Sequence, residues 1–192
     1  MLGVFASESN ALYGLISSEI HRIWSRKVGS TLETRTRYTA TDCFETFALP
    51  SGAANTVGEV MKALHDHRAT FMLGSGRGLT ATYNRVHAPD DADAGVLALR
   101  KLHRVLDKAV LSAYSWDDIN LDHDFCDTEE GLRYTISYAA RVEILDRLLE
   151  LNHERHAAEV ASGARGASRR KNGSARRGEN GRDSAPALLE LQ

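Results

Sequence analysis

The chain has 192 residues, of which 42% are hydrophobic and 26% charged, and its formal net charge is −2 at pH 7. This composition is ordinary for a globular protein, and the net charge argues against a uniformly basic nucleic-acid-binding protein, so any DNA contact needs a local basic patch. Two cysteines are too few for a disulfide framework, and no apolar run approaches the roughly 20 residues that span a bilayer. The N-terminal residues lack the regions of a signal peptide. We therefore expect a cytoplasmic protein without a membrane partner.

The N-terminal part is expected to form one helix followed by two short strands. Apolar residues recur at helical spacing over residues 8–28. Threonines and a tyrosine favour a strand over residues 34–39, in which Arg35 and Arg37 fall on one face. After a turn, a second short strand is expected at Cys43–Phe47.

Two further helices are expected in the central region. The first begins at Asn55 or Thr56 and continues to residue 73. Residues 74–78 lack the GK[ST] ending of a phosphate loop, so we interpret this glycine-rich segment as a hinge between helices. The second begins at the acidic residues after Pro89, where the helix dipole favours negative charge. Its buried face consists of Leu99, Leu102, Val105, Leu106, Ala109, Val110 and Ala113. The charged residues on the rest of its circumference are expected to be solvated: Arg100, Lys101, Arg104 and Lys108.

The C-terminal part begins with an acidic, irregular segment after Trp116. Its acidic, histidine and cysteine residues match neither a zinc-ligand spacing nor a calcium loop, so no metal site is expected. A short strand at residues 132–137 and a last helix from Ala139 to about residue 160 follow. Residues 161–192 are rich in Gly, Ser, Ala and Arg and are expected to be disordered, either as a polyanion-binding arm or as a solvating tail.

Together these elements predict a mainly α (α+β) fold. The helices are expected to pack like a bundle around one core, with a small two-strand element near residues 33–47 and a disordered C-terminal tail.

Two runs of residues resemble a known family of proteins. Residues 37–50 are RYTATDCFETFALP, and residues 79–116 contain LTATYNRVHAP and then LRKLHRVLDKAVLSAYSW. They resemble the end of the target-recognition domain and the C-terminal region of bacterial type II restriction–modification enzymes that join an adenine-N6 DNA methyltransferase to that domain. Ser115 stands where the family pattern has glycine, and serine adopts a positive φ only at a cost.

The resemblance implies double-stranded DNA as a partner. The candidate DNA-binding residues are Lys27, Arg35, Arg37, Tyr38, Arg77, Asn84 and Arg85. The planar guanidinium of an arginine suits bidentate contact with phosphate or guanine. Alternatively, the two arginines of the expected strand pair with Glu33 and Glu45. Asn84 and Arg85 could contact a base edge, although we favour a structural role in which they hold the neighbouring helix.

The same resemblance implies three regions: residues 1–50 as the end of the target-recognition domain, residues 51–160 as a helical region, and residues 161–192 as a basic tail. No methylase motif is found: the [DNS]PP[YFW] tetrapeptide needs adjacent prolines, and the prolines stand at positions 50, 89 and 186. We therefore expect a DNA-specificity fragment without catalytic or metal-binding residues. S-adenosylmethionine would be bound by the absent methylase domain, and a separate methylase or restriction subunit is a candidate partner.

The alternative is a helical protein-interaction module or an inactive remnant that does not bind DNA. The DNA hypothesis predicts that Lys27, Arg35, Arg37 and Arg77 gather on one face, whereas the alternative predicts that they are dispersed beside an apolar groove. A truncated remnant would expose a lost interface, formed by Leu12, Ile16, Ile20 and Trp24.

Overall fold

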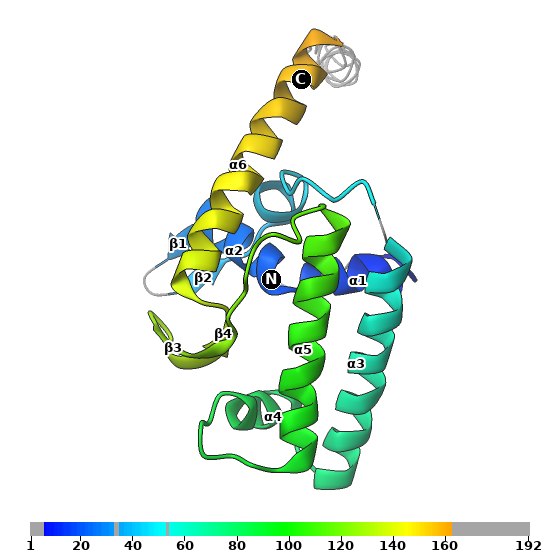
Figure 1. Cartoon of the computed structure of the whole chain (residues 1–192), viewed down its shortest axis with the longest axis vertical. Helices are drawn as coiled ribbons and strands as arrows, with labels where there is room; N and C mark the ends of the chain where they lie inside the picture. Colours follow the sequence, from blue (N-terminus) through cyan, green and yellow to red (C-terminus); the bar gives the residue numbers. More distant parts are fainter. Residues whose placement is uncertain (1–5, 33–34, 53, 163–192) are drawn as a thin grey trace, which may run out of the picture. The chain divides into compact units, whose positions relative to one another are not determined.

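The computed structural model describes residues 6–32, 35–52 and 54–162, so almost all of the predicted tail lies outside the described residues. The chain divides into two compact units, residues 1–152 and residues 153–192. Its helices are α1 (Asn10–Ser17), α2 (Glu19–Val28), the π-helical turn η1 (Ala40–Phe44), α3 (Ala54–Ser75), α4 (Leu79–Val86), α5 (Ala94–Ala113) and α6 (Tyr138–Ala161) (Figure 1). Two separate antiparallel pairs of strands join β1 (Ser30–Leu32) to β2 (Arg35–Arg37) and β3 (Asp124–Thr128) to β4 (Gly131–Thr135). The predicted mainly helical fold with a small two-strand element is confirmed.

The single N-terminal helix predicted over residues 8–28 is wrong, because the chain breaks at Ser18. This residue has extended backbone angles, and its side chain accepts a hydrogen bond from the N–H of His21 at the start of α2. Its hydroxyl also donates to the carbonyl of Leu15 at the end of α1. One serine therefore ends α1 and begins α2, which allows an uninterrupted apolar pattern to serve two helices.

The apolar surface predicted to mark a lost interface is not exposed. Ile20 has no exposed surface and Trp24 is 2% exposed, while Leu12 and Ile16 are half-buried. Ile20 and Trp24 belong to the core of the first unit. The sequence pattern could not separate an intramolecular contact from an intermolecular one.

The second strand predicted at Cys43–Phe47 is also wrong, because η1 occupies this place. Thr39 caps η1: its hydroxyl donates to the Asp42 carboxylate at 2.6 Å and accepts from the Asp42 N–H. This local capping overrides the strand propensity of the phenylalanines and threonine. The two-strand element lies earlier, with Ser30 opposite Arg37 and Leu32 opposite Arg35.

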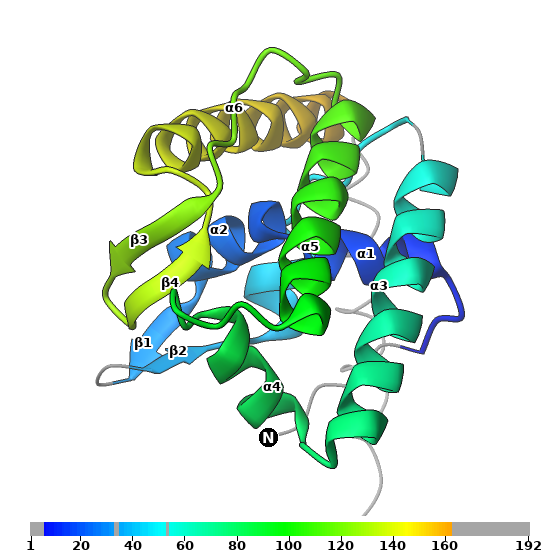
Figure 2. The same cartoon turned by 60° about the horizontal axis from the view of Figure 1, so that its bottom comes forward.

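The core of the first unit is built on α3 and α5, which run side by side (Figures 1 and 2). Helix α1 packs closely on α3, since a Cβ atom placed on Gly14 would lie 2.7 Å from Cγ1 of Val57. The largest fully buried side chains are Ile20, Met61, Leu64, Leu99, Leu106, Ile136, Ile144 and Leu148. They come from α2, α3, α5, the β4–α6 connection and α6, so elements distant in the sequence share one core.

Helix α5 departs from its predicted faces at two positions. Lys101, Arg104 and Lys108 are exposed as predicted, but Arg100 is buried and only 7% exposed. Its guanidinium donates to the backbone carbonyls of Arg85, Val86, Ala88 and Asp91 at 2.5–3.2 Å. Val105, predicted to be buried, is 42% exposed.

Helix α5 begins where the acidic residues predicted it. Asp93 is its N-cap, and its carboxylate accepts hydrogen bonds from the N–H groups of Gly95 and Val96. The acidic segment that follows α5 was expected to be irregular, yet residues 124–128 form β3 and pair with β4. Within the described residues, no helix is long and apolar enough to cross a membrane.

Helix α5 ends in a Schellman motif centred on Ser115, which has a φ of +61°. The N–H of Ser115 donates to the carbonyl of Ser112, and the N–H of Trp116 donates to the carbonyl of Leu111, each at 3.0 Å. This motif favours glycine at the left-handed position. The sequence put this turn in doubt, but the structure keeps it, with Ser115 in the left-handed conformation that favours glycine.

Replacing Ser115 with glycine is expected to raise the free energy of unfolding by about 0.5–1 kcal/mol. The left-handed conformation costs an L-residue about 1–2 kcal/mol, and the greater freedom of glycine in the unfolded chain cancels part of the gain. Urea unfolding followed by tryptophan fluorescence measures the difference. Ser112→Gly, inside α5, is the control and should lower stability; a loss of stability in Ser115→Gly would contradict the prediction.

Candidate nucleic-acid interface

The predicted DNA-binding residues fall into two groups along the chain. Lys27 is exposed near the end of α2, Arg35 and Arg37 lie in β2, and Tyr38 follows directly after β2. We call residues 27–38 the hairpin segment. The other predicted residues lie elsewhere in the sequence, in the α3–α4 connection and in α4: Arg77, Asn84 and Arg85.

The end of the hairpin segment is fixed to α2 by Tyr38. Its hydroxyl shares a 3.0 Å hydrogen bond with Nε2 of His21, and its ring meets the imidazole edge-on. The same imidazole packs against Phe47 with ring centroids 4.6 Å apart. One turn along α2, the indole N–H of Trp24 donates to the hydroxyl of Thr46 at 3.0 Å. The residues before and after η1 are thus held on one side of α2.

Burial keeps His21 uncharged at neutral pH. Removal from water lowers the pKa of His21 to about 4 and raises the pKa of Tyr38. The contact between them therefore joins a neutral imidazole to a neutral phenol. Because 43% of the Tyr38 surface remains exposed, this residue combines a fixed ring with an accessible edge.

Neighbouring cations of α2 differ in their availability to a ligand. The guanidinium of Arg26 pairs with Glu130 at 2.7 Å and with Glu129 at 2.9 Å, both in the connection between β3 and β4. Lys27 is exposed and takes part in no ion pair within the described ranges. Of the two, Lys27 is therefore the one free to meet a phosphate.

Arg85 has the structural partners that the alternative reading of Asn84 and Arg85 required. Its guanidinium pairs with Asp91 at 2.6 Å and Asp93 at 3.1 Å, and lies over the ring of Phe71. The hydrogen bonds that Arg85 donates to these carboxylates raise its pKa. Arg85 thus stabilises the loop that starts α5, while Asn84 is exposed on α4.

A polar network that the sequence did not predict joins α2, α4 and α5. The carboxylate of Asp107 accepts from the N–H of Glu19 at 2.8 Å and contacts Nε2 of His123 at 2.8 Å. The hydroxyl of Tyr83 lies 2.8 Å from Nε2 of His103. Three of its members, Tyr83, His103 and Asp107, lie in the run at residues 79–116 that resembles the family pattern. Their place in that run is the one feature of the sequence that pointed to them.

This network lines a cavity of about 350 Å³ inside the first unit. Burial raises the pKa of Asp107 and lowers the pKa of His103 to about 4, so His103 is neutral at physiological pH. The residues at 122–127 that resemble metal ligands by type contribute His123 to the network, as the partner of Asp107. Among the described residues, no group of three or more potential ligands is arranged to hold a metal ion.

Comparison with known proteins found one family model and one solved structure that are similar to this chain. Residues 3–51 match the family model described as the MmeI target recognition domain. The chain is also similar to the solved structure of the Type IIL restriction–modification enzyme MmeI in complex with DNA, with a TM-score of 0.56 and 24% sequence identity. That similarity covers 79% of this chain and 17% of the MmeI chain. No curated protein matches the chain in sequence.

The two comparisons bear on different parts of the prediction. The match over residues 3–51 includes the whole hairpin segment and supports a target-recognition domain of a restriction–modification enzyme. The structural similarity shows a shared fold over most of the chain. The boundaries predicted at residues 50 and 160 stay predictions.

Proposed function

We propose that this chain is the DNA-specificity part of a restriction–modification enzyme and that its hairpin segment contacts duplex DNA. The observation that carries this proposal is the match of residues 3–51 to a target recognition domain, since that range contains Lys27, Arg35, Arg37 and Tyr38. The similar MmeI structure was solved in complex with DNA, which supports the same partner here.

The local structure supports a hairpin segment that is fixed at both ends. Helix α2 holds its start, and the contact of Tyr38 with His21 holds its end on the same helix. A segment whose two ends are held loses less entropy when it binds than one whose ends are free. Arginine is the side chain most often used for bidentate contact with guanine, so Arg35 and Arg37 are assigned to base contact and Lys27 to phosphate.

We infer that methyl transfer belongs to another part of the enzyme. The chain spans 17% of the MmeI chain that it resembles, and its sequence contains no adjacent prolines for a base-gripping tetrapeptide. In this proposal the chain corresponds to the C-terminal region of an adenine-N6 methyltransferase. S-adenosylmethionine is bound by a methylase domain, which flips the target base, and a separate methylase or restriction subunit is a candidate partner.

The double substitution Arg35→Ala and Arg37→Ala is expected to weaken binding to cognate duplex DNA about a hundredfold. Each bidentate contact with a base contributes about 1–3 kcal/mol of discrimination, so the preference for the cognate duplex should fall as well. Fluorescence anisotropy with cognate and scrambled duplexes, the cognate one selected from a random library, measures both quantities.

The matched control is Lys62→Ala, which removes an exposed cation of α3 that is paired with Asp66. It should leave DNA binding unchanged. Equal affinity and equal preference in the double variant and the unaltered chain would contradict the assignment of Arg35 and Arg37. It would favour the alternative of a helical protein-interaction module.

A further inference from the structure

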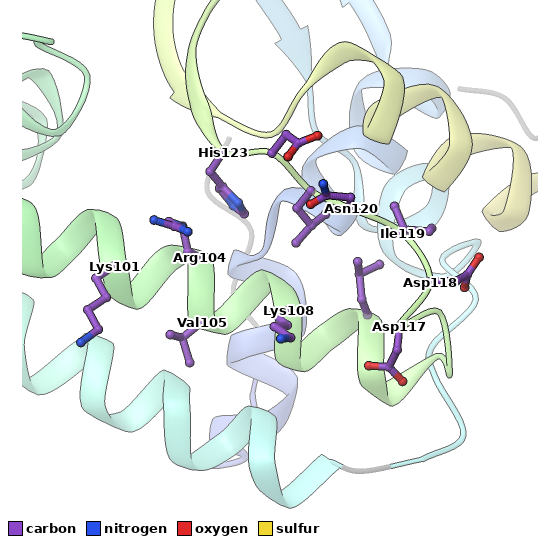
Figure 3. A pocket seen from close by; sticks show the side chains of 12 residues that line it. Lys101, Arg104, Val105, Lys108, Asp117, Asp118, Ile119, Asn120 and His123 are labelled. Atoms are coloured by element: carbon purple, nitrogen blue, oxygen red, sulfur yellow. The ribbon is translucent and has the colours of Figure 1, made fainter.

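A second basic surface lies on α5, outside the match to the target recognition domain. Lys101, Arg104 and Lys108 are exposed and follow one another at intervals of three and four residues, which places them on one face of the helix. We call these three residues the α5 ridge. It borders a groove of about 860 Å³ between α5 and the segment 117–123 (Figure 3).

The fold makes little use of these charges. Arg22, Arg26, Arg85, Arg133 and Arg147 all take part in ion pairs. In contrast, Lys101 and Lys108 take part in no ion pair or hydrogen bond within the described part of the chain, and Arg104 has the hydroxyl of Tyr134 as its partner. Solvated cations that the fold does not need remain available to an anionic ligand.

The acidic side chains of the groove are placed differently. In Figure 3, Lys101 and Arg104 lie toward one end of the groove and Asp117 and Asp118 lie at the other. Asp118 is held by Arg147 at 2.5 and 2.9 Å, and Asp117 accepts a hydrogen bond from Ser112. These two carboxylates therefore already have partners, whereas Lys101 at the other end and Lys108 between the two ends have no ion-pair partner among the described residues. Asp122 also lines the groove, so the positive surface is confined to the edge formed by α5.

The spacing of the α5 ridge suits the backbone of a nucleic acid. Lys108 lies seven positions after Lys101 in the helix, which is a rise of about 10 Å at 1.5 Å per residue. One strand of B-DNA rises about 3.4 Å per phosphate along its axis, so a ridge aligned with that axis spans the rise of about three phosphates. Lysine contacts with phosphate carry no sequence information, and such contacts set position and affinity instead.

We propose that the α5 ridge is a second, sequence-independent contact for the phosphate backbone of DNA. This inference rests on the function proposed above. In it, the hairpin segment contributes specificity, and the ridge contributes affinity that depends strongly on salt. A protein partner for the groove is the competing occupant, and the test below separates the two.

The test compares four full-length chains: the unaltered chain, Lys101→Gln with Lys108→Gln, the charge-keeping Lys101→Arg with Lys108→Arg, and the control Lys62→Gln. Each binds cognate and scrambled duplexes across a series of salt concentrations. Loss of two phosphate contacts should weaken both duplexes about tenfold and reduce the slope of log affinity against log salt by about 2, with the cognate preference kept. The arginine pair and the Lys62 control should behave like the unaltered chain.

Three outcomes would overturn the inference. A glutamine double variant with unaltered affinity and slope, and with the circular dichroism and melting temperature of the original chain, would leave a protein partner as the occupant of the groove. A variant that loses only the cognate preference would place the ridge in base contact. An unaltered chain that binds neither duplex would overturn the proposed function together with this inference.

Discussion

Replacing Arg100 with methionine is expected to lower the free energy of unfolding by about 3 kcal/mol or more. The guanidinium donates to four backbone carbonyls between residues 85 and 91 and lies over the ring of Phe125 at 4.9 Å. Methionine has a similar length but no donor, so the carbonyls of Val86 and Asp91 would lose this donor, whereas those of Arg85 and Ala88 would keep a backbone N–H donor. Each unsatisfied buried polar group costs about 1–3 kcal/mol.

Urea unfolding followed by circular dichroism measures this loss. Lys101→Met, at the next and exposed position of α5, is the control and should change stability by less than about 0.5 kcal/mol. Arg100→Lys should fall between the two, because one ammonium group cannot reach all the carbonyls. A change below about 1 kcal/mol in Arg100→Met would show that the α4–α5 loop does not depend on this residue.

Acidification from pH 7.5 to pH 5 is expected to cost several kcal/mol of stability. Burial lowers the pKa values of His21 and His103 to about 4 in the folded chain, against 6.5 for the free side chain. Between pH 6.5 and pH 4 the unfolded state therefore binds more protons than the folded state, so stability decreases as the pH falls. Each histidine contributes about 2 kcal/mol of this loss by pH 5. The raised pKa of buried Asp107 acts in the opposite direction and reduces the total.

Urea unfolding at pH 7.5 and pH 5 gives the loss directly. His103→Gln keeps a hydrogen-bond acceptor for Tyr83 but cannot titrate, so its stability should fall less between the two pH values. The exposed His65 offers a control, since His65→Gln should keep the full pH dependence. An equal loss of unfolding free energy between pH 7.5 and pH 5 in His103→Gln and in the unaltered chain would show that His103 is not buried in its neutral form.

The long helices could be predicted from the sequence because their signals are local. Periodic apolar residues predicted α3, α5 and α6, and Asp93 predicted where α5 begins. Serine at position 115, where the family pattern has glycine, indicated a positive φ that is unfavourable for this residue. Each of these features depends on residues within one or two helical turns.

The errors have tertiary or competing local causes. Arg100 was expected in solvent because a charged residue on a helix usually is, and only the carbonyls of the α4–α5 loop explain its burial. At Ser18 and Thr39, capping side chains outweighed the surrounding pattern. The network of Glu19, Asp107 and His123 joins residues more than 80 positions apart, so no local pattern could reveal it.

The candidate interface was predicted in part. The sequence singled out Lys27 and Tyr38, and the structure gives their surroundings: an ammonium with no ion pair among the described residues, and a ring fixed on α2. Arg85 was proposed for DNA, but its ion pairs favour the structural role. Whether all the predicted cations share one face stays a prediction, because it depends on side chains of β2 that lie outside the described ones.

Duplex-DNA binding across a salt series, measured for the full chain and for a version ending at Val160, tests the central claim most directly. We expect the shortened chain to keep its preference for the cognate duplex, and Arg35→Ala with Arg37→Ala to remove this preference in both versions. Recognition then resides in the folded part. Binding that disappears entirely with the tail, with no preference between duplexes in the full chain, would contradict the account and reduce the DNA contact to a non-specific basic arm.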